Sequence, residues 1–161
     1  MNLQIRSIQE KDKDFVRQAL INLWGSDKIV YSGRVFDAGI LPGFIANADN
    51  RAIGLLTYFV EGKSCQIISI NALTPGKGIG TALLEKLKDI AKEKGCDKLL
   101  TITTNDAVAA LAFYKSRGFF VKKIHKGAIA LSRAIKPEIP LLGENGIPIE
   151  DEIELEMSLT D

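Results

Sequence analysis

The stretch "PGKGIGTALLEKL", residues 75–87, contains three glycines within five positions and continues directly into a helical pattern of apolar residues. Glycine is unfavourable inside a helix and weakens a strand. A glycine-rich turn between a strand and a helix leaves the first helical N–H groups without partners, and the helix dipole adds positive potential there. Since Lys77 adds a full positive charge, this stretch predicts a binding site for a diphosphate.

Two other phosphate-binding motifs do not fit the same stretch. The P-loop pattern G-x-x-x-x-G-K-[ST] is absent from it, and the dinucleotide fingerprint G-x-G-x-x-G fits Gly76 and Gly78 but meets Thr81 at its last glycine. A simple turn before a core helix, in a nucleotide-binding or purely interacting domain, remains open as the alternative.

Periodicity along the rest of the chain predicts a mixture of strands and helices. Helices are expected at 12–23, from the glycines to near Gly95, at 107–115 and at 128–135. Strands are expected at 3–8, 29–31, 43–48, 52–61, 64–73, 98–103, 119–124 and 149–159. This order predicts an α+β (mixed α/β) fold, with a central, mostly antiparallel mixed sheet flanked by helices in one domain over residues 1–161.

The last predicted strand alternates acidic and apolar residues. Ile153, Leu155, Met157 and Leu159 are expected to face the core, with Glu152, Glu154 and Glu156 on a solvated face.

Composition narrows the possible partners. The net charge is +1, from 21 basic and 20 acidic residues, which favours neither nucleic acid nor an anionic membrane as the main partner. One histidine and two cysteines, Cys65 and Cys96, give no metal-type spacing, so no metal is expected. The first residues lack a long apolar run, which predicts a cytoplasmic enzyme whose reduced cysteines are small core residues.

A second motif, downstream, strengthens the first. Asn105-Asp106-x-x-Ala109-x-x-x-Phe113-Tyr114-x-x-x-Gly118-Phe119 follows the glycine stretch at a characteristic distance. Together the two motifs resemble the GNAT superfamily of N-acetyltransferases, whose signature is Gln/Arg-x-x-Gly-x-Gly/Ala between the fourth strand and the next helix. Pro75 stands where Gln or Arg is usual. The resemblance extends over roughly residues 53–122.

The resemblance implies that acetyl-CoA binds and that an amine attacks its thioester directly. Its pyrophosphate would bind the loop amides, and its pantetheine arm would lie beside the preceding strand, in a slot left where strand 98–103 splays away. N–H groups near Ala72 or Leu73 would polarise the carbonyl. The implied cofactor-binding residues are Asn71, Ala72, Leu73, Gly76, Lys77, Gly78, Ile79, Gly80, Thr81, Asn105 and Tyr114.

Catalytic roles are assigned to fewer residues. Tyr114 would protonate the departing thiolate, because a tyrosine with a pKa of ~10 keeps its proton at neutral pH. Asn105 would bind pantetheine or cap the next helix, and Asp106 could cap that helix equally well. The strand before the loop has no acid, so Glu61 and Asp37 are the candidate bases, with His125 expected at the surface.

The resemblance implies that residues 24–42 and 124–148 form the acceptor side. Tyr31, Arg34, Phe36 and Asp37 are candidates to line it, although Trp24 and Phe36 are more typical of core positions. The acceptor is an amine of a small molecule or of a protein, and its identity stays open. The alternative function is a CoA-binding module of the same fold without catalysis. Exposed strand edges would allow a homodimer, but no residue requires one.

Overall fold

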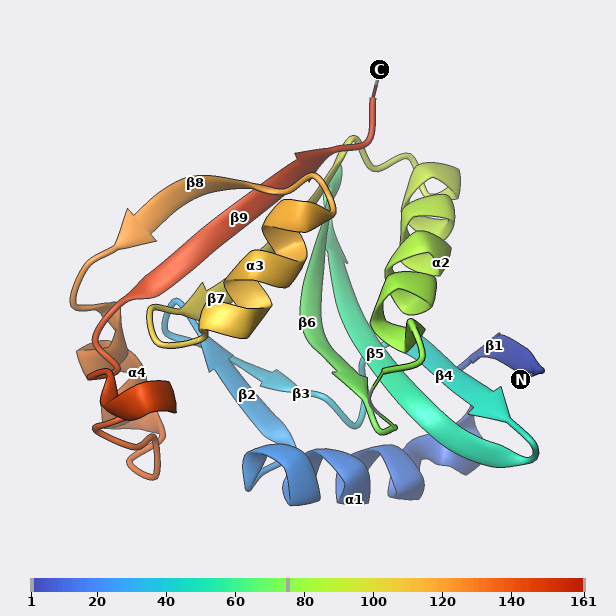
Figure 1. Cartoon of the computed structure of the whole chain (residues 1–161), viewed down its shortest axis with the longest axis horizontal. Coiled ribbons are helices and arrows are strands. Elements are labelled where there is room, and N and C mark those ends of the chain that lie inside the picture. Colours follow the sequence, from blue (N-terminus) through green and yellow to red (C-terminus); the bar gives the residue numbers. More distant parts are fainter. Residues whose placement is uncertain (1, 75, 161) are drawn as a thin grey trace.

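A computed structural model describes residues 2–74 and 76–160 of the chain. Within these residues the main element is a seven-stranded sheet with the order β1-β4-β5-β6-β7-β9-β8 (Figure 1). Its strands are β1 (Leu3–Ser7), β4 (Gly43–Ala48), β5 (Arg51–Glu61), β6 (Ser64–Ala72), β7 (Lys98–Thr104), β8 (Phe120–His125) and β9 (Glu152–Ser158). Only the β6–β7 pair is parallel, so the predicted mostly antiparallel mixed sheet is confirmed.

Helices and a small hairpin surround this sheet. The hairpin consists of β2 (Lys28–Tyr31) and β3 (Arg34–Asp37), of which β3 was not expected from the sequence. The helices are α1 (Lys13–Trp24), α2 (Ile79–Glu93), α3 (Val108–Ser116) and α4 (Ala128–Ile135), with short 3₁₀ turns at η1 (Glu10–Asp12) and η2 (Glu144–Gly146). None of the described helices is long and apolar enough to cross a membrane.

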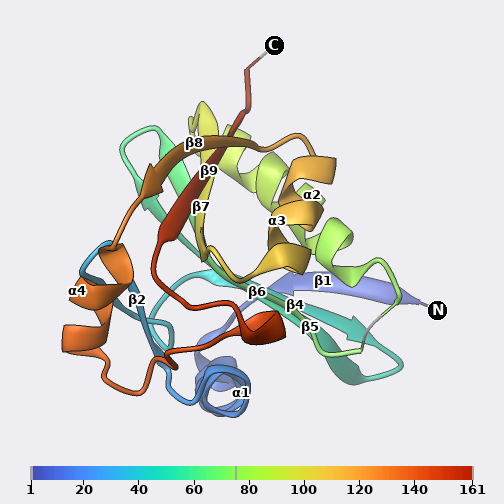
Figure 2. The same ribbon diagram turned by 60° about the vertical axis from the view of Figure 1, so that its left-hand side comes forward.

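Each face of the central strands contributes to a separate core. On β4 and β5, Phe44 pairs with Leu56 and Ile45 pairs with Leu55, and successive side chains point to opposite faces. Phe44 and Leu56 join the core beneath α2 and α3, whereas Ile45 and Leu55 join the core beneath α1 and the β2–β3 hairpin. The two layers of helices on opposite faces can be followed in Figures 1 and 2.

Helix α2 is fixed firmly onto the sheet. Its Leu83, Leu84 and Leu87 are fully buried, and burying each leucine stabilises the fold by about 1.5–3 kcal/mol. At the start of α2, Ile79 packs directly over Gly54 of β5, where an added Cβ would lie 2.4 Å from Ile79 Cγ2. This close approach holds the first turn of α2, and therefore the glycine loop before it, against the sheet.

The segment between β8 and β9 forms a separate lobe. It carries α4 and η2 and lies beside β2 in both ribbon views (Figures 1 and 2). From this lobe the chain enters β9, where Ile153, Leu155, Met157 and Leu159 are buried as expected.

The expected solvation of the acidic face of β9 is wrong for one residue. Glu152 is only 1% exposed, while Glu154 and Glu156 remain partly exposed. The reason is the turn of the β2–β3 hairpin, which covers the start of β9: Ser32 N–H donates to both Glu152 carboxylate oxygens, at 3.0 and 3.2 Å.

Candidate functional site

The first cavity opens where β6 and β7 separate. Their parallel pairing ends at Ile67 and Thr101, although β6 continues to Ala72 and β7 to Thr104. The predicted splay is therefore confirmed. A cavity of about 440 Å³ lies at this opening, and we call it the slot. It is lined by both strands, the glycine loop, the start of α2 and one face of α3.

The free edge of β6 presents backbone groups to the slot. Leu73 N–H donates to Ile53 O of β5 at 2.7 Å, so this amide is already occupied. Because antiparallel pairs alternate, the backbone groups of Ala72 and Ile70 point away from β5 and toward the slot. The Asn71 side chain turns elsewhere and accepts a bond from Trp24 Nε1 at 3.3 Å. Of the residues Asn71, Ala72 and Leu73, Ala72 is thus the one whose amide faces the slot.

The glycine loop has the conformation of an anion cradle. Gly76 and Gly78 have φ values of +80° and +68°, and a Cβ on either would meet no atom within 4 Å. The backbone therefore favours glycine at both positions, and the space above them is open. The hydrogen bonds of α2 begin with Ala82 N–H, which donates to Gly78 O. The amides of Ile79, Gly80 and Thr81 before it therefore have no acceptor within the helix and lie at its free N-terminus. Pro75 lies outside the described residues.

The predicted loop residues do not all have the same role. Lys77 lines the slot, and Ile79 is buried in the core, so only its amide is available to a ligand. An added Cβ on Gly80 would approach the Phe113 ring at 3.4 Å, so this glycine allows α2 and α3 to pack closely.

Arg117 is a second cation at this end of the slot that sequence reasoning missed. Its Nε and NH2 groups donate to Thr81 Oγ1 at 3.0 and 2.7 Å, and its guanidinium lies 5.0 Å from the Phe113 ring centroid. The exposed side chain is thereby held beside the N-terminus of α2. The only available signal was its place one residue before Gly118, and that position carries no specific pattern.

Tyr114 lines the slot from α3, as the resemblance implied. It is 5% exposed and packs edge-to-face against Phe113 and Phe119. Burial raises the pKa of Tyr114, and the nearby Thr101 hydroxyl partly opposes this increase. The phenol therefore keeps its proton at neutral pH and can serve as a donor inside the slot.

The acceptor-side residues divide into two groups. Tyr31 and Trp24 both line the slot. Burial raises the pKa of Tyr31, and a negative charge on the nearby Tyr114 would raise this pKa further. In contrast, Phe36 is a core residue, and Arg34 stacks over the Phe36 and Phe59 rings at 5.1 Å without lining the slot.

Asn105 and Asp106 bind the C-terminal segment. Asn105 Nδ2 donates to Pro148 O at 2.8 Å, while Asn105 Oδ1 accepts from the amides of Glu150 and Asp151, each at 3.0 Å. Asp106 accepts from Glu144 N–H at 3.2 Å and does not cap α3, whose N-cap is Ala107. Both polar groups of Asn105 are occupied and Asn105 does not line the slot, so the structure gives it neither of its expected roles.

The candidate bases do not reach the slot. Glu61 pairs with Ser64, at the start of β6. Ser64 precedes Ser69, which lines the slot, by five residues, so Glu61 lies roughly 17 Å along the strand from Ser69. It is exposed and bonds Arg34 at 3.4 Å. Asp37 forms an ion pair with Arg17 at 2.9 Å. Burial alone would raise the pKa of Asp37, but Arg17 and the Gly39 amide outweigh it and lower this pKa overall.

His125 bonds Glu154 and does not line the slot either. A buried carboxylate that does lie on the acceptor side is Glu152, for which the alternation of β9 predicts a solvated position. Burial raises the pKa of Glu152, with smaller lowering effects from the Ser32 amide, His125 and Ser132.

The side chains that commonly bind metals do not form a metal centre among the described residues. Cys65 and Cys96 are buried and unbridged, and burial raises the pKa of the Cys65 thiol to about 12. Over residues 2–74 and 76–160, no group of three or more His, Cys, Asp or Glu side chains is arranged to hold a metal ion.

Comparison with known proteins agrees with this geometry. The model of the acetyltransferase (GNAT) family matches residues 18–119, and the chain belongs to this family. The uncharacterized protein YxbD of Bacillus subtilis (strain 168) is 42% identical over 142 residues, which are 88% of this chain and 89% of YxbD.

Two solved structures have the same fold over almost the whole chain. The IAA acetyltransferase from Bacillus cereus ATCC 14579 has a TM-score of 0.75 and 26% identity, covering 98% of this chain and 99% of that one. A GNAT family acetyltransferase from Elizabethkingia anophelis, solved with acetyl-CoA bound, has a TM-score of 0.70 and 23% identity, with 98% of each chain covered.

Proposed function

We propose that this protein transfers an acetyl group from acetyl-CoA to the nitrogen of an amine by direct attack. The observation that carries the proposal is the glycine loop at the free N-terminus of α2, which opens onto the slot between β6 and β7. Family membership and the acetyl-CoA bound in the Elizabethkingia relative support the same co-substrate.

The loop fits a diphosphate for electrostatic reasons. The amides of Gly78 to Thr81, the α2 dipole, Lys77 and Arg117 all place positive charge or donors at one end of the slot. The free edge of β6 at Ile70 and Ala72 would pair with the amide groups of the pantetheine arm. These contacts would direct the thioester toward Tyr114.

The residues of the slot then suggest how the reaction proceeds. The amine loses a proton, its lone pair attacks the thioester carbonyl carbon, and a C–N bond replaces the C–S bond. The thiolate, whose acid has a pKa near ~8.5, takes a proton from Tyr114. The Tyr114 phenolate then takes the second proton from the acetylated nitrogen. Of the two protons that the ammonium form loses overall, one thus ends on sulfur by way of Tyr114 and the other passes to solvent.

One alternative has a specific observation in its favour. The described residues that line the slot include no carboxylate, which suits a CoA-binding module that has lost catalysis. Thiol release from acetyl-CoA, followed in the presence and absence of a panel of amines, separates the two functions. Amine-dependent release supports the transferase, whereas binding of acetyl-CoA without any release supports the module.

A further inference from the structure

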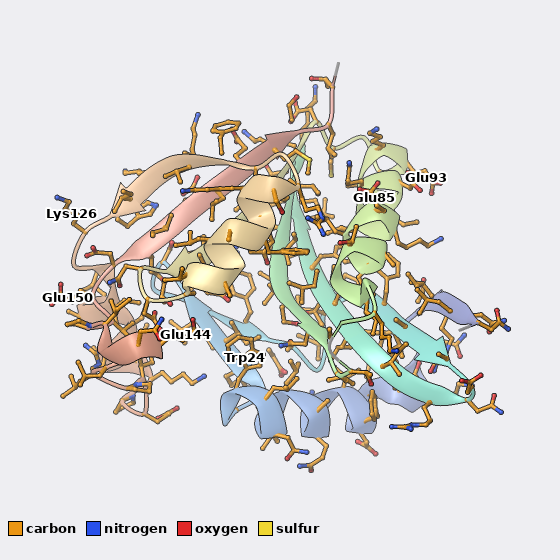
Figure 3. All side chains as sticks on the ribbon, in the orientation of Figure 1. Trp24, Glu85, Glu93, Lys126, Glu144 and Glu150 are labelled. Carbon is orange, nitrogen blue, oxygen red and sulfur yellow. The ribbon has the colours of Figure 1, made fainter. Side chains whose placement is uncertain are left out.

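A second cavity adjoins the slot. It has a volume of about 350 Å³ and shares Trp24, Tyr31, Thr103 and Ala110 with the slot. Its remaining walls come from β2, the segment between β7 and α3, α4 with the residues that follow it, the loop around η2 and the start of β9. Trp24 and Glu144, which lie on different elements in Figure 3, both line it. Its volume is within the range of small-molecule sites.

Two polar residues lie deeply buried in this cavity. Glu152 and Ser132 are each 1% exposed. Ser132 Oγ makes no hydrogen bond of normal geometry among the described residues, although it lies near enough to Glu152 to lower the pKa of that carboxyl. The walls beside them include Ile29, Val30, Ile129, Ile139 and Pro140. A buried polar group whose hydrogen bonding is incomplete is unfavourable by about 1–3 kcal/mol, so a ligand that hydrogen-bonds Ser132 and Glu152 together would be stabilising here.

Glu152 also lacks a cationic partner. It accepts the Ser32 amide, but no described Lys, Arg or His nitrogen lies within ion-pair distance of its carboxylate. His125 of β8 is near enough to lower the pKa of Glu152, yet its Nε2 bonds Glu154. Lys136, the one cation among the described lining residues, donates to Lys28 O at 3.1 Å. A buried carboxylate of this kind is stabilised most by a positively charged ligand.

The charge of the cavity restricts the ligand further. Its described lining includes four acids, Asp106, Glu138, Glu144 and Glu152, against the single cation Lys136. A ligand that carries its own carboxylate would be repelled, while an ammonium group would be attracted. The apolar walls would accommodate an alkyl or aromatic body.

We propose that the second cavity binds the acceptor, a primary amine with an apolar body and no anionic group, through its ammonium at Glu152. This proposal rests on the proposed function. Glu152 takes the first proton from the ammonium, and the free amine then reaches the slot past Tyr31, which lines both cavities. The C–N bond forms and the C–S bond breaks as described above, and Glu152 returns its proton to solvent.

The test compares two amines of the same body in the thiol-release assay. We use phenethylamine and L-phenylalanine, which differ by one carboxylate. The expected kcat/KM is about 30-fold or more higher for phenethylamine, because a carboxylate would face the buried Glu152 and the other acids of the cavity lining. Equal or better turnover of L-phenylalanine would overturn the proposal.

Variants of Glu152 test the contact itself. Glu152→Gln is expected to raise the KM for phenethylamine about 30-fold or more, since it removes one charge of a buried pair, while the Kd of acetyl-CoA stays unchanged. Glu150→Gln is the matched control, because Glu150 is an exposed acid two residues away (Figure 3). An unchanged KM in Glu152→Gln would overturn the proposal.

A third variant covers the case in which Glu152→Gln does not fold. Ile139→Trp narrows the cavity from a partly exposed loop position, and it should raise the KM for phenethylamine but not the KM for methylamine. Equal effects on both amines would contradict the assignment. If other amines release thiol and phenethylamine does not, this inference alone fails; if acetyl-CoA neither binds nor reacts, the proposed function fails with it.

Discussion

The slot and the second cavity lie side by side but are built from different parts of the chain. The polar groups of the slot that would hold acetyl-CoA are mainly backbone: the loop amides, the free edge of β6 and the N-terminus of α2. The second cavity presents mainly side chains, contributed by β2, the segment between β7 and α3, α4, the η2 loop and β9. Backbone groups suit a ligand part that never varies, such as a diphosphate, whereas side chains can be exchanged to suit one acceptor.

This difference predicts that changes in the slot affect acetyl-CoA and changes in the second cavity affect the amine. The largest effect is expected for Gly78→Glu. Its φ of +68° strains any other residue, and the new negative charge would stand at the N-terminus of α2. Acetyl-CoA binding, measured by isothermal titration, should weaken about 100-fold or more, because strain and repulsion together approach ~3 kcal/mol.

Gly95→Glu is the control for this variant. Gly95 has a φ of +81° with no atom within 4 Å of an added Cβ, and it follows the opposite end of α2. It should bear similar backbone strain and keep acetyl-CoA affinity. Equal loss of binding in both variants would show that strain, and not the position of the charge, is responsible.

Tyr114→Phe tests chemistry rather than binding in the slot. Loss of the acid should lower kcat about 10²-fold at neutral pH and leave acetyl-CoA affinity unchanged. Because burial raises the pKa of Tyr114, the wild type should keep its rate into the alkaline range. Tyr58→Phe, a buried tyrosine that does not line the slot, is the control. Unchanged turnover of Tyr114→Phe from pH 6 to 9 would eliminate the acid role.

Arg117→Ala should have a smaller effect on the same ligand. Arg117 is exposed, so its contribution to phosphate binding is screened, and we expect acetyl-CoA affinity to fall about fivefold, corresponding to ~1 kcal/mol. The loss should shrink at high salt. Lys115→Ala removes an exposed cation from α3 that does not line the slot, and it should bind normally. A larger effect at Lys115 would contradict the placement of the anion.

The smallest expected effect is on the stability of the Glu152→Gln variant, which should increase at neutral pH although its activity decreases. The raised pKa of Glu152 means that the folded state binds its proton more tightly than the unfolded state does. Stability from the neutral carboxyl is therefore lost as pH rises from the unfolded value of ~4.3 through the folded value. Glu152→Gln should raise the urea midpoint at pH 7–8, and the gain should shrink toward pH 4. A lower midpoint at pH 8 would contradict this account.

The two regions also differ in how far the sequence alone predicts them. Gly76 and Gly78 were recognisable because their requirement is local: a positive φ before a helix. Burial of Glu152 was not, because the amide that covers it belongs to Ser32, 120 residues away along the chain. The alternation of β9 correctly identified its core face, but it carries no information on what lies over the other face.

The catalytic candidates illustrate the same limit. Tyr114 could be assigned from a spaced motif, and it lines the slot. Glu61 was chosen for its place in a neighbouring strand, but strand register puts it beside Ser64, at the paired end of β6. Registers and hairpin positions depend on contacts between distant segments, so local patterns could not have decided them.

The most direct test of the account is a crystal structure of the protein with CoA and phenethylamine together. We expect the diphosphate on the amides of Gly78 to Thr81, the thiol near Tyr114, and the amine nitrogen within hydrogen-bonding distance of Glu152. A diphosphate bound away from this loop, or an amine bound away from Glu152, would contradict the division of the site into these two cavities.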